Sequence, residues 1–192
     1  MRQNRLPLQK LQRAFTLIEL MVTISVLGVI MAIALPNLRD FVVGNRLSSN
    51  VNAFIGMLSY ARSEAIVRNQ PVVVCAKKNS AIGCETTDSE WGKYETQIFV
   101  DEDGNGTRNG TEELLKTFAA IDTTGTQFRF FKQTATDSIS FQSGGLGNAT
   151  FRFDINVKSN DTAYEIRYGR TVCISRQGRT RVREYSNSCP NL

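Results

Sequence analysis

The most informative pattern in the chain is a continuous apolar run at Phe15–Leu35, where Glu19 is the one charged residue. A run of about 20 apolar residues is long enough to cross a bilayer as a helix. After Pro36 the apolar residues recur at helical spacing, with polar residues between them. This one-sided stripe comprises Leu38, Phe41/Val42, Leu47, Val51, Phe54/Ile55, Leu58, Ala61 and Ala65. Asn69-Gln70-Pro71 then supplies a stop, so we expect one helix from Phe15 to about Asn69.

The pattern changes again after Pro71, where short β-branched and aromatic runs alternate with glycine-rich turns. Such runs predict antiparallel strands. The candidate strands are Val72–Cys75, Gln97–Asp101, Leu114–Phe118, Phe128–Lys132, Ser138–Phe141, Phe151–Val157, Tyr164–Ile174 and Arg179–Tyr185. We therefore expect an α+β fold, in which a transmembrane half (residues 15–35) and an amphipathic half (residues 36–70) form a long N-terminal helix. The amphipathic half packs on an antiparallel β domain at residues 71–192.

Charge is concentrated before the apolar run. Residues 1–14 carry four basic side chains and no acidic one, which predicts that this leader stays in the cytoplasm. The whole chain has a formal net charge of +5, from 23 basic and 18 acidic residues. Without the leader the balance is close to neutral, so the overall charge says little about partners.

The heptapeptide Ala14–Leu20, AFTLIEL, resembles the processing site of type IV prepilins and type II secretion pseudopilins. The resemblance implies that a membrane prepilin peptidase removes residues 1–14, cutting between Ala14 and Phe15, and methylates Phe15. It also implies that Glu19 meets the Phe15 amine of a neighbouring subunit during filament assembly. Opposite charges in low dielectric offset each other's desolvation cost. The family usually has glycine before the cut, and Ala14 is a departure from that pattern.

A cleavable secretory signal peptide is the alternative for this segment. Ala32-Ile33-Ala34 is an A-x-A-like site after an apolar run. The length of the run, the charge of Glu19 and the seven-residue match favour a retained pilin helix. We therefore expect the protein in the bacterial inner membrane, with the β domain in the periplasm, and then in a surface pilus.

Four cysteines fall into two local pairs, Cys75/Cys84 and Cys173/Cys189. An exported domain meets an oxidising compartment, which favours disulfides. Four cysteines allow three connectivities, and proximity in sequence favours the one that joins each local pair. A zinc site is disfavoured, because the chain has no histidine and the cysteine spacings are not C-x-x-C.

The absence of histidine also excludes a Ser-His-Asp triad, a Cys-His dyad and an H-E-x-x-H zinc site. The sequence contains no G-x-x-x-x-G-K-[ST] loop. We expect a protein that is not an enzyme and has no cofactor.

Residues 101–112 match the calcium-loop pattern D-x-[DN]-x-[DN]-G-x5-E, with Asp101, Asp103, Asn105 and Glu112 as the oxygen donors. An EF-hand loop lies between two helices, whereas the flanks of this loop read as strands. Arg108 also places a positive charge inside it. A turn-forming connection between two strands is therefore favoured over a calcium site, and we expect no metal there.

Arginine is concentrated near the C-terminus, where residues Glu165–Leu192 carry a local charge of +4. Gln177-Gly178 marks a turn, after which Arg179, Arg181 and Arg183 alternate with other residues. On a strand this period places the three guanidinium groups on one face, roughly 7 Å apart. Such a face suits successive phosphates, with binding that depends on salt and not on sequence. The alternative is a solvated strand face or arginines paired with filament neighbours.

Gly178-Arg179-Thr180-Arg181 resembles the G-R-x-R element of FimT-like minor pilins, which contacts DNA during natural transformation. Cys75…Cys84…Trp91 followed by Ile98–Asp101 is similar to the wider FimT/GspH family. The resemblance implies DNA contacts by Gly178, Arg179 and Arg181, and adjacency adds Arg176 and Arg183. We expect a minor type IV pilin that binds double-stranded DNA without sequence specificity and assembles with other pilin subunits. The alternative is a minor pseudopilin of the type II secretion system.

Overall fold

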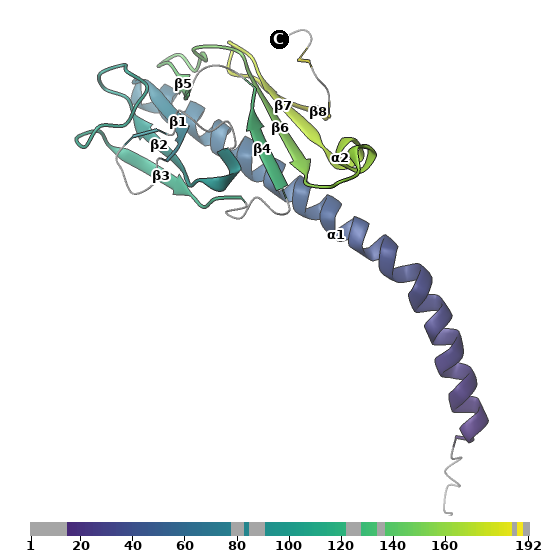
Figure 1. Ribbon diagram of the computed structural model, residues 1–192. Coiled ribbons are helices and arrows are strands. Elements are labelled where there is room, and N and C mark those ends of the chain that lie inside the picture. The colour runs from purple at the N-terminus through teal and green to yellow at the C-terminus, as the bar shows by residue number, and fades with distance from the viewer. Residues whose placement is uncertain are drawn as a thin grey trace, which may run out of the picture. The chain divides into compact units, whose positions relative to one another are not determined.

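The computed structural model describes residues 15–77, 83–84, 91–121, 128–133, 137–185 and 188–189. The chain divides into two compact units, Met1–Val42 and Val43–Leu192. Helix α1 (Leu17–Arg68) contributes to both units (Figure 1). The predicted leader, including Ala14, lies outside the described residues.

The part of α1 that belongs to the first unit is exposed along the apolar run. The helix contains a stretch that is long and apolar enough to cross a membrane. At its start, the Glu19 amide donates to Thr16 Oγ1 over 3.3 Å. This is the N-terminal hydrogen bond of a Thr-x-x-Glu capping box.

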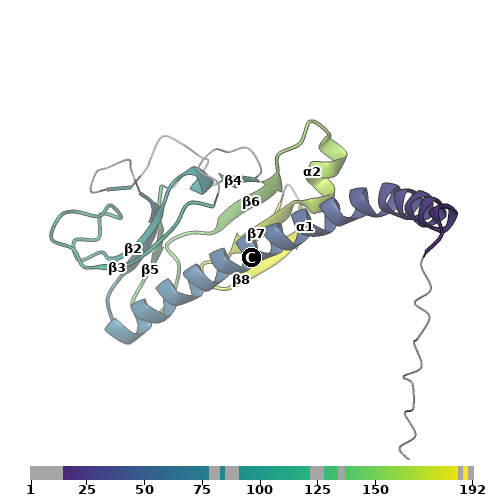
Figure 2. The same cartoon turned by 90° about the horizontal axis from the view of Figure 1, so that it is seen from below.

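The second unit holds two four-stranded antiparallel sheets, seen side by side in Figures 1 and 2. The first has the order β3-β2-β1-β5, from β1 (Val72–Ala76), β2 (Thr96–Val100), β3 (Leu114–Phe118) and β5 (Ile139–Phe141). The second has the order β4-β6-β7-β8, from β4 (Phe128–Lys132), β6 (Phe151–Val157), β7 (Arg170–Ile174) and β8 (Thr180–Glu184). A 3-10 turn, η1 (Trp91–Lys93), precedes β2.

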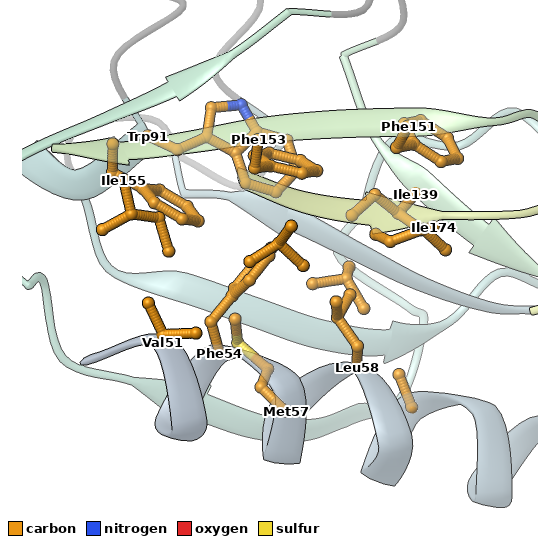
Figure 3. Packing of buried hydrophobic residues seen from close by; sticks show 14 of the residues in the cluster. Val51, Phe54, Met57, Leu58, Trp91, Ile139, Phe151, Phe153, Ile155 and Ile174 are labelled. Carbon is orange, nitrogen blue, oxygen red and sulfur yellow. The ribbon is translucent and has the colours of Figure 1, made fainter. Parts of the chain in front are cut away.

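The core lies between α1 and the inner faces of the sheets (Figure 3). The Phe54 ring meets the rings of Phe130 and Phe153 edge-on, at centroid distances of 4.6 and 5.0 Å. Trp91 packs on Phe153 from the opposite side, 5.1 Å away. Edge-on aromatic contacts add to the stabilisation from burial alone. The expected long helix on an antiparallel β domain is confirmed.

Burial along α1 begins at Leu47 and continues through Val51, Phe54, Leu58, Ala61 and Ala65. Leu38, Phe41 and Val42 continue the predicted stripe toward the N-terminus but are exposed, and all three belong to the first unit. The helical spacing of apolar residues therefore predicts the buried face correctly from Leu47 on. The part of the predicted stripe before Leu47 is not buried.

One predicted strand, Tyr164–Ile174, is wrong in its first half. Residues Thr162–Tyr168 form a helix, α2, and β7 begins at Arg170. The Asp161 side chain caps this helix by accepting from the Ala163 amide over 2.9 Å. The rings of Tyr164 and Tyr168 then meet one turn apart, with centroids 4.7 Å apart. Capping thus prevails over an alternating sequence that reads as a strand.

Candidate nucleic-acid interface

The candidate interface is the β7–β8 hairpin, which carries the arginines near the C-terminus. Its turn is held locally: the Gly178 amide donates to the Ser175 carbonyl over 2.9 Å, and the Ser175 amide donates to the Arg179 carbonyl over 2.9 Å. The Ser175 hydroxyl also accepts from the Arg179 amide over 3.2 Å. These bonds fix the backbone on which the arginine side chains stand.

Gly178 is required by the shape of this turn. Its φ is +72°, in the region that favours glycine. A Cβ at this position would lie 2.4 Å from the Gly145 carbonyl oxygen and 2.8 Å from Arg62 Nε. Gly178 is itself buried, so its place here is structural and it positions the residues on either side.

Arg62, on α1, supports the turn through two hydrogen bonds. Its Nε donates to the Gly145 carbonyl over 3.0 Å, and its Nη2 donates to the Gln177 carbonyl over 3.0 Å. The Gly147 amide adds a third support by donating to the Arg176 carbonyl over 2.8 Å. Sequence reasoning missed Arg62, which lies 115 residues before Gln177 on a helix face that reads as ordinary polar surface.

Register determines which arginines share a face of β8. Arg181 pairs with Cys173 and Arg183 pairs with Thr171, whereas Val182 pairs with the core residue Val172. Cross-strand partners lie on the same face, so Arg181 and Arg183 stand on the outer face of the sheet, roughly 7 Å apart. Arg179 precedes the strand, so the shared face is that of two arginines on β8, with a third in the turn.

The side chains of Arg176, Arg179, Arg181 and Arg183 are exposed. Among the described residues none of the four forms an ion pair, whereas Arg152 on β6 is paired with Asp154 over 2.7 Å. β8 is also the edge of its sheet. The hairpin therefore offers charge that is not neutralised by the described part of the domain.

A groove of about 690 Å³ lies between α1 and the hairpin turn. Its walls combine apolar residues of α1, such as Ile55 and Ile66, with Arg179 and Arg181. Basic groups therefore lie next to apolar residues in the lining of this groove. This composition suits a protein side chain as well as a phosphate backbone.

Both cysteine pairs form disulfides, Cys75–Cys84 and Cys173–Cys189, with Cα–Cα distances of 5.6 and 5.9 Å. Cys75 lies on β1, and both cysteines of the first disulfide are buried. The second joins Cys189 to Cys173 on β7, on the face that carries Arg181. It therefore holds Cys189 on the same face of the sheet as Arg181.

The loop that matches the calcium-loop pattern connects β2 to β3, as expected from its flanks. Burial raises the pKa of the Asp101 carboxyl above its ordinary value, and the Gly106 amide opposes that rise. The nearby Glu112 and Asp103 carboxylates raise this pKa further.

Comparisons with known proteins fit this geometry. Residues 50–178 match the family described as type II transport protein GspH, and residues 9–35 match the prokaryotic N-terminal methylation motif. A fimbrial protein of Pseudomonas aeruginosa is 31% identical over 111 residues, covering 56% of this chain and 69% of that protein. The type IV major pilin PilE of Neisseria gonorrhoeae is 32% identical over 91 residues, covering 47% and 52%.

Among solved structures, the type IV minor pilin FimU of Pseudomonas aeruginosa has a similar fold. The TM-score is 0.54 at 23% identity, and the match covers 72% of this chain and 89% of FimU. With the family match over two thirds of its length and the methylation motif at its start, this chain belongs to the GspH family of minor pilins and pseudopilins.

Proposed function

We propose that this protein is a minor type IV pilin whose β7–β8 hairpin binds extracellular double-stranded DNA for uptake. The observation that supports DNA binding is the set of four exposed arginines that no described carboxylate neutralises. Planar guanidinium groups match phosphate oxygens with two hydrogen bonds each. Arg176, Gly178, Arg179, Arg181 and Arg183 form the proposed site, with Gly178 acting through the turn. No catalysis is part of this function.

Phosphate contacts position a protein on DNA but carry no sequence information. Arginine is also the side chain that most often reads guanine in the major groove, and the proposal assigns the four exposed guanidinium groups to phosphates and not to base edges. Binding is therefore expected to depend steeply on salt and little on sequence. Equilibrium binding of the full chain, in non-ionic detergent, to unrelated duplexes at rising salt tests this. Tight binding to one sequence at high salt would contradict it.

We further propose that the N-terminus follows the pathway of its family. Prepilin peptidase would remove residues 1–14 after Ala14 and methylate Phe15, leaving α1 as an anchor in the inner membrane with the β domain in the periplasm. Glu19 would then guide assembly with other pilin subunits into a surface filament. The exposed apolar surface of α1 before Val43 supports this, because such a surface is unstable in water and is covered by lipid or neighbouring helices.

A second candidate is a minor pseudopilin of the type II secretion system. The family description, type II transport protein, favours it, and so does the groove with apolar walls beside Arg179 and Arg181. In that case the arginines would meet acidic groups of protein partners. A chain that shows no salt-dependent DNA binding at low salt, and whose hairpin variants impair secretion, would support this second function.

A further inference from the structure

The loop between β2 and β3 gathers acidic side chains at one point. Ligand oxygens of Asp101, Asp103 and Glu112 all lie within 4.8 Å of one another. Asp101 and Glu112 are only 3% and 2% exposed, whereas Asp103 is open to solvent. Buried carboxylates this close together repel one another, so they need either protons or a cation.

One atom in this cluster has no partner. Asp101 Oδ2 accepts from the Gly106 amide over 3.1 Å, but Asp101 Oδ1 is buried and makes no hydrogen bond within the described structure. Buried polar atoms are normally satisfied, and an unsatisfied one calls for an explanation such as a bound ion. This orphaned oxygen is the observation that distinguishes the loop from an ordinary acidic turn.

The Glu112 carboxylate is held in place by the loop backbone. Glu112 Oε1 and Oε2 accept from the amides of Glu102 and Asn109, over 3.1 and 2.8 Å. Each carboxylate oxygen can accept more than one bond, so these contacts orient Glu112 without using its full capacity. Gly106, at the sixth position of the loop, has a φ of +75°, which allows the sharp turn that calcium loops have there.

Arg108 does not neutralise the cluster. Its Nη2 donates to the backbone carbonyl of Glu112 over 3.3 Å, and its Nε is buried with no hydrogen-bond partner in the part of the chain that the structure describes. Within the described residues, Asp101, Asp103 and Glu112 form no ion pair. The negative charge of the loop is therefore available to a cation.

We propose that the β2–β3 loop binds one calcium ion through the carboxylates of Asp101, Asp103 and Glu112. The side-chain oxygen of Asn105, at the fifth position, and a backbone carbonyl complete an all-oxygen set. Calcium accepts 6–8 oxygens in flexible geometry, whereas magnesium demands a near-ideal octahedron. Strands flank this loop, so the ion would stabilise a β-hairpin, whereas the ion of an EF-hand lies between two helices. This proposal does not depend on DNA binding. It differs from the expectation of a turn without metal, which the flanking strands suggested.

Thermal unfolding of the full chain in non-ionic detergent tests the site, in chelator, calcium chloride or magnesium chloride. Extracellular calcium modules have dissociation constants of about 0.1–1 mM. At about 5 mM calcium we therefore expect a rise in Tm of roughly 2–9 °C, and a much smaller rise with magnesium. Calorimetric titration should give one calcium per chain. No calcium-dependent rise and no heat of binding would overturn the proposal.

Two variants separate a calcium site from a general effect of charge. Asp101→Asn should abolish the calcium-dependent rise, while in chelator its Tm should match or exceed that of the wild type because a buried charge is gone. Glu102→Gln removes the same charge from an exposed neighbouring position and should keep the rise. Equal losses in both variants would overturn the proposal. Asp103→Asn, at an exposed position, gives the same test if Asp101→Asn does not fold.

Discussion

Arg62 Nη2 lies 3.0 Å from the Gln177 carbonyl oxygen, so a helix residue supports the turn that carries the arginines. The same guanidinium also holds the Gly145 carbonyl, 3.0 Å from Nε. A planar fork can serve two carbonyls at once, which a lysine ammonium on a flexible stem does less well. The arginine hairpin is therefore positioned by a residue that does not itself belong to the proposed interface.

Arg62→Lys should loosen the hairpin turn while keeping the charge. Losing one of two charge-assisted hydrogen bonds should cost about 1–3 kcal/mol locally. The Gly178 amide, which donates within the turn, should then exchange with deuterium faster, as amide exchange measured by mass spectrometry or NMR would show. Arg129→Lys, on β4, is the control and should leave that exchange unchanged. Unaltered exchange in Arg62→Lys would remove Arg62 from its positioning role.

Gly178→Ala should destabilise the second unit. The positive φ and the Gly145 oxygen 2.4 Å from the new Cβ both oppose a side chain, at a combined cost of about 1–3 kcal/mol. Gly144→Ala is the matched control, because a Cβ there would meet nothing within 4 Å. Urea unfolding of the two variants and the wild type measures the difference. Equal stability of both variants would show that the turn has another conformation available.

The two disulfides should contribute unequally. Each closes a short loop worth about 3 kcal/mol in the chain-entropy model, with sequence separations of 9 and 16. Cys75→Ala/Cys84→Ala removes two buried sulfur atoms, whereas Cys173→Ala/Cys189→Ala removes one from a buried and one from a half-buried residue, so the first variant should lower Tm more. Differential scanning calorimetry of the two double variants checks this order. The reverse order would mean that Cys173–Cys189 contributes more to stability than Cys75–Cys84.

The proposed assembly role of Glu19 rests on its charge, whereas its observed contact is the backbone amide that donates to Thr16 Oγ1 in a capping box. Glutamine also serves in a capping box, but it carries no charge. We therefore expect Glu19→Gln and Glu19→Ala to be processed normally and to be incorporated poorly into filaments. Immunoblots of sheared pili, compared with whole cells, measure incorporation. Normal incorporation of Glu19→Gln, alongside poor incorporation of Glu19→Ala, would assign the residue to capping.

Much of the fold was predictable because each main element carries its own period. The stripe from Leu47 to Ala65 predicts the buried face of α1, and the β-branched runs predict most strands. The exception is α2, where Tyr164, Ile166 and Tyr168 alternate as in a strand. Asp161 caps α2 by accepting a hydrogen bond of 2.9 Å from the Ala163 amide. The spacing of apolar residues does not reveal a capping residue, so the helix was missed.

The shared face of Arg181 and Arg183 was also predictable, since a turn followed by alternating residues determines a face. Arg179 was predicted on the same face, but it lies in the turn before β8. The contact that supports the turn was not predictable. Arg62 reaches the hairpin from a sequence distance of 115 residues, and only the tertiary structure reveals the contact. Similarly, the sequence pattern supplied the donors of the β2–β3 loop, but the orphaned oxygen of Asp101 follows from burial.

DNA binding by the hairpin is tested most directly with Arg179→Ala/Arg181→Ala. The control is Lys93→Ala/Lys116→Ala, which removes the same charge from exposed positions outside the hairpin, in η1 and β3. Dissociation constants for a duplex, measured by fluorescence anisotropy over a salt series, should rise about 10- to 100-fold at low salt in the arginine variant. Its salt slope should fall by about 2, because two phosphate contacts are lost, and the lysine variant should resemble the wild type. Equal affinities and equal slopes in the wild type and both variants would contradict DNA binding by this hairpin.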